Sequence, residues 1–249
     1  MNKLLEICAG EVTSVEAAVR GGAQRVELCS ALDVGGVTPS AGFVRGAVTC
    51  GIRCHVLVRP REGDFVYSSS EVDAMLADID MAAVCGAAGV AIGALTADGE
   101  IDTAVCTRLV DRARSHGLSV TFHRAFDCAV NPFEAIEAVI GLGADRLLTS
   151  GCAPSAAKGV KMLKQLNDRA GGRIRLIAAA GVNSGNAAEI LAESGCREIH
   201  ASARRPVTVC HTNSNRAVSD GFYSDTRLTT DPAEVRAIVN AIQNSAFQK

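Results

Sequence analysis

The sequence predicts a single-domain α/β protein with a (β/α)8 TIM-type barrel. Short apolar runs alternate eight times with stretches of helical periodicity, at a spacing of about 30 residues. The runs are apolar almost throughout, as in parallel strands that are covered on both faces. An open doubly wound sheet is the alternative. It would call for a glycine-rich fingerprint after the first run, and the sequence has none, so we also expect no nucleotide cofactor.

The predicted strands and helices take their bounds from apolar periodicity and from capping residues. Asp102 and Asn131, the latter followed by Pro132, are helix-start signals, and Ser70 with Asp73 is another. Glycines mark most of the turns from a helix into the next strand. The predicted strands are 4–8, 25–29, 53–58, 90–93, 119–123, 146–149, 175–179 and 198–201. The predicted helices are 13–22, 39–48, 70–86, 102–115, 132–141, 155–169, 183–194 and 232–246.

Composition narrows the class of partner. The 249 residues carry a formal net charge of −2 and no basic run, which argues against nucleic acid and against a charged membrane surface. No apolar stretch approaches the roughly 20 residues of a membrane span, and Glu6 interrupts the position of a signal peptide. We therefore expect a cytoplasmic protein whose partner is a small molecule, an ion or a second copy of itself. The 10 cysteines are scattered without a CxxC pair, so most are expected to be buried apolar residues.

One segment breaks the alternation. Residues 203–230 are rich in Ser, Thr, Asn and Arg and show no clear periodicity, so they are predicted to form a long loop. Loops of this length in a compact domain are commonly functional. The segment is therefore expected to cover the mouth of the barrel or to contact another subunit. The whole chain, 1–249, is expected to form a single domain.

A repeated Glu-x-Cys pattern is the strongest local signal. Glu6-Ile7-Cys8 ends the first predicted strand, and Glu27-Leu28-Cys29 ends the second, 21 residues later. A strand-helix-strand unit places its two strands parallel and usually adjacent. Residues two apart share a face of a strand, so matching registers would bring two carboxyls and two thiols together.

The paired thiols favour a soft metal ion. Neighbouring strands lie roughly 4.8 Å apart, so two cysteines in register would hold one ion between them. Two thiolates suit Cu(I), whereas zinc would require four ligands and would have to recruit His or Glu. The alternative is that Cys8 and Cys29 only pack in the core.

Barrel enzymes work at the carboxyl ends of their strands, where this sequence places many polar residues. The candidate catalytic residues are Glu6, Glu27, Asp64, His123 and Asp127. The candidate ligand-binding residues are Arg59, Arg61, Arg124, Ser150, Gly181, His200 and Ser202.

Three interpretations of this polar cluster remain open. Buried Glu6 and Glu27 require compensation, for which Arg59, Arg61 and Arg124 are available, so the cluster would be a stabilising plug. Alternatively, the arginines bind a phosphate or carboxylate. In the third interpretation the protein is an enzyme for a small anionic metabolite, and His123 exchanges protons near neutral pH.

A series of motifs resembles the CutC copper homeostasis family over essentially the whole chain. Each motif is short, but their number and order are specific. The motifs are Glu6-Ile7-Cys8, Arg25-Val26-Glu27-Leu28-Cys29, Gly35-Gly36-Val37-Thr38-Pro39-Ser40, Arg59-Pro60-Arg61-Glu62-Gly63-Asp64-Phe65, Thr121-Phe122-His123-Arg124-Ala125-Phe126-Asp127 and Leu148-Thr149-Ser150-Gly151.

The resemblance implies a cytoplasmic barrel protein that forms a homo-oligomer, a dimer or tetramer, and has a role in copper handling. It also implies that Cys8 and Cys29 are Cu(I) ligands. The expected partner is accordingly a copper ion or a small anionic molecule. Copper handling alone does not explain so many ionisable residues at the strand ends, so the sequence leaves open whether the protein is an enzyme.

Overall fold

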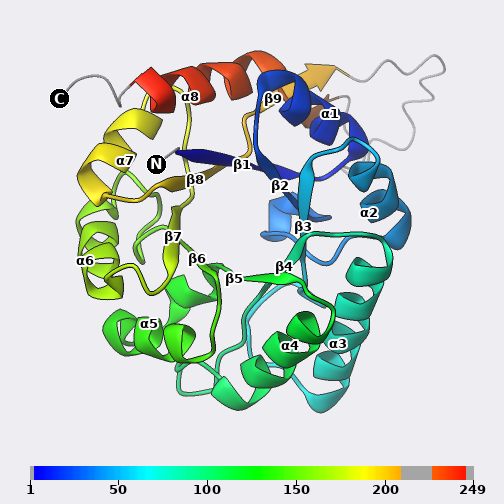
Figure 1. The fold of residues 1–249 in the computed structure, drawn as a ribbon, viewed down its shortest axis with the longest axis vertical. Helices are drawn as coiled ribbons and strands as arrows, with labels where there is room; N and C mark the ends of the chain where they lie inside the picture. The colour runs from blue at the N-terminus through cyan, green and yellow to red at the C-terminus, as the bar shows by residue number, and fades with distance from the viewer. Residues whose placement is uncertain (1–2, 209–225, 245–249) are drawn as a thin grey trace, which may run out of the picture.

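The computed structural model describes residues 3–208 and 226–244, which form a closed barrel of parallel strands ringed by helices (Figure 1). The strands follow one another in chain order, and β8 closes the ring against β1. This confirms the predicted fold class. The strands are β1 (Leu4–Ala9), β2 (Arg25–Leu28), β3 (Arg53–Leu57), β4 (Gly89–Ile92), β5 (Ser119–Phe122), β6 (Arg146–Thr149), β7 (Arg175–Ala178) and β8 (Glu198–Ala201).

The helices lie on the outside of the barrel and cover its apolar surface (Figure 1). Two predicted helices start later than expected, because residues 155–159 and 184–186 are turns and bends. The α-helices are α1 (Val12–Gly21), α2 (Ala41–Val48), α3 (Ser69–Val84), α4 (Thr103–Ser115), α5 (Pro132–Gly141), α6 (Val160–Ala170), α7 (Ala187–Ser194) and α8 (Pro232–Asn244). Two 3-10 helices, η1 (Leu32–Val34) and η2 (Arg124–Cys128), were not predicted.

Side-chain caps fix several helix starts. The side chains of Asp102 and Asn131 accept hydrogen bonds from the first turns of α4 and α5, as predicted. The start of α3 differs from the prediction. Ser68 and Glu71 form a capping box there, so the cap is Ser68 and not Ser70.

Alternation along the strands divides the side chains between two environments. Leu5 and Ile7 of β1 belong to the main core between the sheet and the helices. Cys8 points to the other face, into the barrel, and packs in a separate small cluster with Cys29 and Leu57. The interior of the barrel is therefore where the Glu-x-Cys motifs place their polar atoms.

The registers of β1 and β2 do not match in the way that would set Glu6 beside Glu27. Cys8 lies opposite Glu27, and Glu6 lies opposite Arg25. Such a stagger between neighbouring strands is required to close a tilted barrel. As a consequence, the Glu6 carboxyl lies next to Arg25, and the Glu27 carboxyl lies next to the Cys8 thiol.

A network of buried charges fills the barrel interior at the start of the strands. The Arg25 guanidinium forms ion pairs with Glu6 and, through Nη2, with Glu198 Oε2 at 2.5 Å. Glu198 also accepts from Nε of Arg146, at 3.2 Å. The arginines expected to compensate Glu6 and Glu27 were Arg59, Arg61 and Arg124, and that expectation is wrong. Arg25 compensates Glu6 from inside the barrel.

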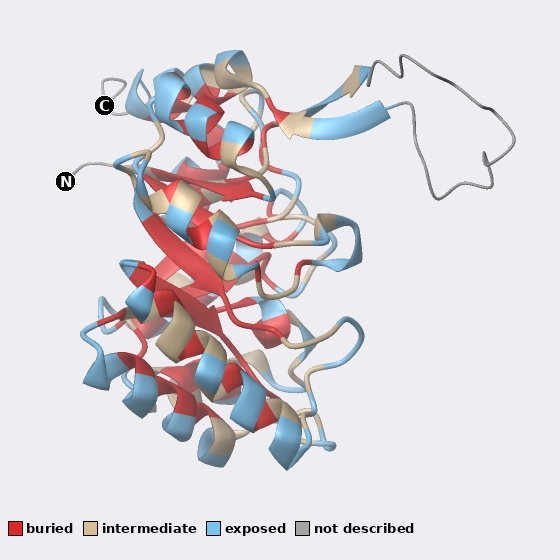
Figure 2. Cartoon of the chain, turned by 90° about the vertical axis from the view of Figure 1, so that its right-hand side faces the viewer, coloured by how far each residue is buried: buried red, intermediate tan, exposed pale blue. Residues whose placement is uncertain are grey.

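The segment predicted as a loop, 203–230, has regular structure at both ends. β9 (Arg204–Thr208) and β10 (Thr226–Thr230) pair as an antiparallel hairpin, and residues 209–225 lie outside the described residues. The paired strands extend away from the barrel and are largely exposed (Figure 2). Glu11 secures their base by accepting from Thr229 Oγ1 at 2.7 Å and by pairing with Arg227. The described helices include none with the length and apolar character needed to cross a membrane.

Candidate functional site

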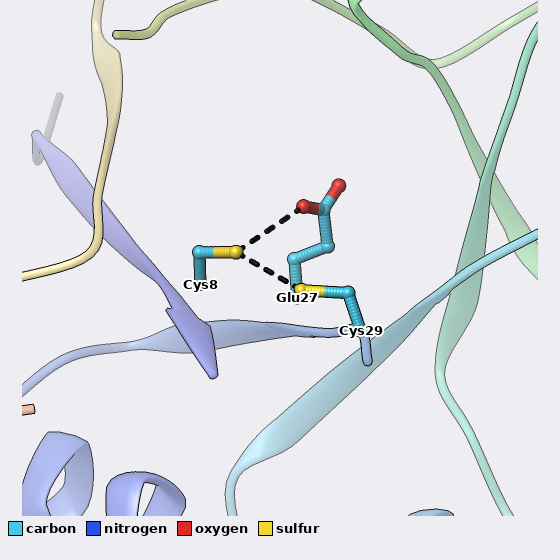
Figure 3. A group of neighbouring side chains, drawn as sticks. All are labelled: Cys8, Glu27 and Cys29. Atoms are coloured by element: carbon cyan, nitrogen blue, oxygen red, sulfur yellow. Dashed lines mark hydrogen bonds between the residues drawn. The ribbon is translucent and has the colours of Figure 1, made fainter. Parts of the chain in front are cut away.

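Two thiols meet at the carboxyl end of β1 and β2. The Sγ atoms of Cys8 and Cys29 lie 3.1 Å apart, and a carboxylate oxygen of Glu27 lies 3.9 Å from the Cys8 sulfur (Figure 3). All three residues are buried. Their ligand atoms lie within 4.8 Å of one another, so one ion would reach all three. The sequence expectation that these two thiols lie together is met.

A turn that contains Gly35 and Gly36 packs closely against Cys29. Gly35 and Gly36 both have φ near +90°, a conformation that glycine adopts without the strain of a Cβ atom. A Cβ at Gly36 would lie 2.7 Å from Leu57 Cδ2 and 3.3 Å from Cys29 Cβ. The turn therefore needs glycine both for its backbone angle and for its close approach to the thiol pair.

His200 of β8 lies between the two carboxyls of the Glu-x-Cys motifs. Its Nδ1 is 2.8 Å from Glu6 Oε1, and its Nε2 is 3.9 Å from Glu27 Oε2. Burial disfavours a charged imidazole, but hydrogen bonds with Cys8 and Glu6 and the charges of both carboxyls raise the pKa of His200 well above its ordinary value. The ring is therefore a cation at neutral pH.

The two carboxyls differ in their protonation. Burial would raise the pKa of Glu6, but the Arg25 charge and the His200 hydrogen bond outweigh it and hold that pKa well below the ordinary range. Burial raises the pKa of Glu27 to about 7. The pKa of the Cys8 thiol is also raised, by its hydrogen bond with Cys29 and by burial. At neutral pH the site thus holds an ionised Glu6, a thiol at Cys8 and a Glu27 that is near its midpoint.

A cavity of 430 Å³ opens above the thiol pair at the mouth of the barrel. Cys8, Glu27 and His200 form part of its lining, and the rest comes from the loops after the strands. A space of this size exceeds one ion and fits a small organic molecule. The further lining residues are Leu32, Val34, Gly35, Leu57, Arg59, Phe65, His123, Arg124, Asp127, Cys128, Leu148, Ala179, Ala180, Gly181, Val182, Ala201 and Ser202.

Arg59 lies in the cavity wall, directly after β3, and is 5% exposed. Its Nη1 donates to the carbonyls of Val34 and Gly36 at 3.0 and 2.9 Å, and its Nη2 donates to the carbonyl of Gly63 at 2.7 Å. The guanidinium also lies over the ring of Phe65, 5.0 Å from its centroid. Carbonyl groups thus fix the guanidinium in place without neutralising its charge.

His123, directly after β5, lies in the same wall. Its Nδ1 accepts from the backbone N–H of Ala125 at 3.2 Å, which caps η2. Burial and the Arg59 charge lower its pKa to about 3, so the ring is neutral at physiological pH. This lowered pKa argues against the expectation that His123 exchanges protons near neutral pH.

Comparison with known proteins identifies the family. The family model described as "CutC family" matches residues 3–205. The chain belongs to the CutC family. A CutC family protein of Chromobacterium violaceum is 45% identical, over 98% of this chain and all of the relative. Another from Bacteroides fragilis is 48% identical over 88% of each chain.

Solved structures agree with this family membership. The crystal structure of a candidate copper homeostasis protein CutC from Streptococcus agalactiae is 32% identical, with a TM-score of 0.76, and the match covers 80% of this chain and 98% of that one. A thiamine phosphate pyrophosphorylase from Pyrococcus furiosus is only 17% identical, with a TM-score of 0.59, and covers 98% of this chain and 96% of that one. The second likeness shows the barrel fold alone.

Most residues that the sequence nominated in this CutC family member line the cavity, but five do not. Glu6 and Cys29 lie behind the lining, in contact with His200 and Cys8 respectively. Ser150 is fully buried, where its hydroxyl contacts Asp127 and Ala153. Arg61 and Asp64 pair with each other at 2.9 Å on the exposed part of the β3 loop. The structure therefore does not bring Arg61, Asp64 or Ser150 into the cavity.

Asp127 lines the cavity but has few lone pairs left for a substrate. Its two oxygens accept from Thr149 Oγ1 at 2.5 Å, from the backbone N–H and hydroxyl of Ser150, from the backbone N–H of Cys152, and from Arg124 Nε at 2.8 Å. These contacts join the loops after β5 and β6. Asp127 is thus better described as a residue that positions the loops than as a free base.

Sequence reasoning missed the interior cations and the aromatic wall. Arg25 and Arg146 open their strands, a position usually exposed to solvent, yet both are buried. Phe65 lines the cavity next to Arg59 and His123, although only the polar residues of its loop were considered. The available signal was the alternation within Arg25-Val26-Glu27, which places Arg25 on the same face as Glu27.

Proposed function

We propose that this protein binds Cu(I) between Cys8 and Cys29 and acts in copper homeostasis. The observation that carries the proposal is the sulfur pair, whose Sγ atoms lie 3.1 Å apart, with Cys8 lining an open cavity and Cys29 directly behind it. Membership of the CutC family, and the copper role in the name of the Streptococcus agalactiae relative, support it.

The donor set fits a soft ion of low coordination number. Two sulfurs and one carboxylate oxygen converge, and no larger group of metal-ligating side chains is found in residues 3–208 and 226–244. Zinc in structural sites takes four ligands. A further donor would be His200, but its raised pKa keeps both ring nitrogens protonated, so it offers no lone pair to the ion. At a metal–sulfur distance of about 2.3 Å, sulfurs 3.1 Å apart subtend an angle of about 85° at the ion. The sulfurs would have to move apart for a trigonal site with Glu27 as the third ligand, and farther still for a linear one.

The thiols must lose protons to bind a metal. The raised pKa of Cys8 means that its proton is still present at neutral pH, so binding releases it. Because Glu27 is the third ligand in this site, the proton passes to solvent through the open cavity. Uptake of the ion would thus be coupled to proton release at the base of the cavity.

A competitive Cu(I) titration under reducing conditions tests the proposal. Cys8→Ser and Cys29→Ser are each expected to weaken Cu(I) binding by about a hundredfold or more, since loss of even an outer-shell partner costs 10–100-fold at metal sites. Cys128→Ser is the matched control, because Cys128 lines the same cavity and is more exposed but belongs to no ligand cluster. Unchanged affinity in both serine variants of the pair would contradict the proposal, as would an equal loss in Cys128→Ser.

The cavity supports a second candidate function, an enzyme that acts on a small anion. Its volume of 430 Å³ and the uncompensated Arg59 in its wall are more than the carriage of one ion requires. We expect a screen of small anionic metabolites by thermal shift to give a ligand that stabilises the wild type. Incubation of that ligand with the protein, followed by NMR of the small molecule, must then show a new product. Ligands that are all recovered unchanged would contradict an enzyme.

Two further expectations are proposals that follow from family membership. We propose that the protein is cytoplasmic and that it forms a homo-oligomer, either a dimer or a tetramer. Light scattering on the full chain measures the second directly. A monomer at micromolar concentration would contradict it.

A further inference from the structure

Two buried N–H groups of the cavity wall have no acceptor. Nε of Arg59 and Nε2 of His123 make no hydrogen bond among the described residues, although both side chains line the cavity. Arg59 is 5% exposed and His123 is 4% exposed. A buried donor without an acceptor costs about 1–3 kcal/mol, and more when it is charged. Two such donors in one cavity wall indicate that an acceptor binds there.

The charge of the cavity wall points to an anion. Among the wall cations, Arg124 pairs with Asp127, and His200 pairs with Glu6. Arg59 has only carbonyl partners in the described part of the chain. The pKa of Asp64 is lowered chiefly by its hydrogen bond with Arg61, and only to a lesser extent by the charge of Arg59. The Asp64 side chain is 69% exposed and pairs with Arg61, so it is not the counter-ion of Arg59. One buried positive charge is therefore left without a counter-ion.

Tyr67 does not supply that counter-ion. Its hydroxyl lies close enough to Arg59 for the guanidinium to oppose the effect of burial on the phenol's pKa. The hydroxyl has no partner within hydrogen-bonding geometry among the described residues, and Tyr67 does not line the cavity. Burial raises the pKa of the phenol to about 12, so it stays neutral at physiological pH. Tyr67 therefore does not balance the charge of Arg59.

His123 offers a neutral donor beside this charge. Because Nδ1 accepts the Ala125 N–H, the proton of the neutral ring is on Nε2. The ring cannot turn to find another partner. Gly93 packs against it so closely that a Cβ there would lie 2.7 Å from the imidazole, and the Phe65 ring lies 5.4 Å away, centroid to centroid.

We propose that the cavity binds a small monocarboxylate through Arg59 and His123. One carboxylate balances the single charge of Arg59, and its two oxygens provide the acceptors that Nε and Nε2 lack. A phosphate dianion would bring a second negative charge that the neutral imidazole cannot balance. Phe65 contacts both Arg59 and His123, so this ring must shift for the carboxylate to reach the two hydrogens.

This subsite is independent of the copper proposal, because it uses none of the thiol ligands. It deepens the second candidate function by naming the chemical class of its ligand, and to that extent it rests on that candidate. The carboxylate would bind at the wall, while Cys8 and Glu27 line the base of the same cavity, with Cys29 behind Cys8. A failed copper titration would not contradict the carboxylate subsite. Failure to bind a carboxylate would likewise not contradict the copper proposal.

NMR on the wild-type protein tests the proposal without any variant. We expect titration of 15N-labelled protein with L-lactate to shift the N–H signals of Arg59 Nε and His123 Nε2 saturably, as new hydrogen bonds form. Lactamide, which has the same shape but no charge, should shift neither. Absence of both shifts with lactate would overturn the proposal. Tighter binding of inorganic phosphate than of lactate would overturn the choice of a carboxylate.

Variants then assign the subsite. Arg59→Gln is expected to weaken lactate binding by about thirtyfold or more, the usual cost of removing one partner from a buried charged pair. His123→Phe should weaken it several-fold, because a neutral donor is lost. Arg61→Gln is the control, since Arg61 lies on the same loop but is paired and outside the cavity. Equal affinities for lactate in Arg59→Gln and Arg61→Gln would contradict the assignment.

Discussion

Arg25→Met is expected to lower the free energy of unfolding by about 3–5 kcal/mol, because it removes one partner from a buried ion network. Arg25 is 1% exposed and pairs with both Glu6 and Glu198. Without it, Glu6 loses the charge that holds its pKa low, and Glu198 keeps Arg146 at 3.2 Å and the more distant, exposed Arg175. Urea denaturation at neutral pH measures the change.

Arg175→Met is the matched control for this change. Arg175 also faces Glu198, at 3.9 Å, but its side chain is 62% exposed. A solvated pair of this kind contributes little, so we expect a change within about 1 kcal/mol. If the two variants lost equal stability, the buried network would not be the source of the effect. A smaller loss in Arg25→Met combined with Glu6→Gln than in Arg25→Met alone would show that the unpaired carboxylate causes the damage.

The fold was predictable because its signals are local. Each strand is an apolar run, and each helix has its own periodicity, so strand number and order follow from reading the chain once. Closure of the barrel then follows from eight repeats of one unit. The errors lie where local signals are weak. Residues 155–159 have helical composition but form turns, and the strand pair β9 and β10 lacks the apolar alternation of a buried sheet.

The site was only partly predictable because register is not a local property. The doubled motif placed Cys8 and Cys29 together correctly, since both face the barrel interior. It did not give the stagger that sets Cys8 opposite Glu27, because the stagger depends on closure of all eight strands. The same holds for Arg25. Its partner Glu198 is 173 residues away, so no reading of neighbouring residues would pair them.

Glu27→Gln is expected to stabilise the protein at pH 8, by about 2–3 kcal/mol, and to have little effect at pH 4. Burial raises the pKa of Glu27 to about 7 from an ordinary value of 4.5. The native state therefore binds more protons than the unfolded state between these two values, so stability falls as the pH rises through this range. A shift of this size corresponds to about 3 kcal/mol. Glutamine stays neutral and avoids this loss.

Glu6→Gln provides a control of opposite sign in the same cluster. The pKa of Glu6 is lowered, chiefly because the Arg25 charge overcomes the effect of burial. Its carboxylate therefore stabilises the native state above the ordinary pKa, and this contribution is lost as the pH falls toward the lowered value. Glu6→Gln should be destabilising at neutral pH, and its effect should shrink at acid pH. Urea denaturation from pH 8 to well below 4.5, the ordinary pKa of a glutamate, compares the two variants with the wild type.

The contrast between these two glutamates separates structure from function in the Glu-x-Cys motifs. We expect Glu6 to stabilise the barrel and Glu27, which lies beside the thiol of Cys8, to reduce stability at neutral pH. We therefore expect Glu27→Gln to be more stable than the wild type yet to bind Cu(I) more weakly. A variant that is less stable at pH 8, or that binds copper with unchanged affinity, would contradict this role.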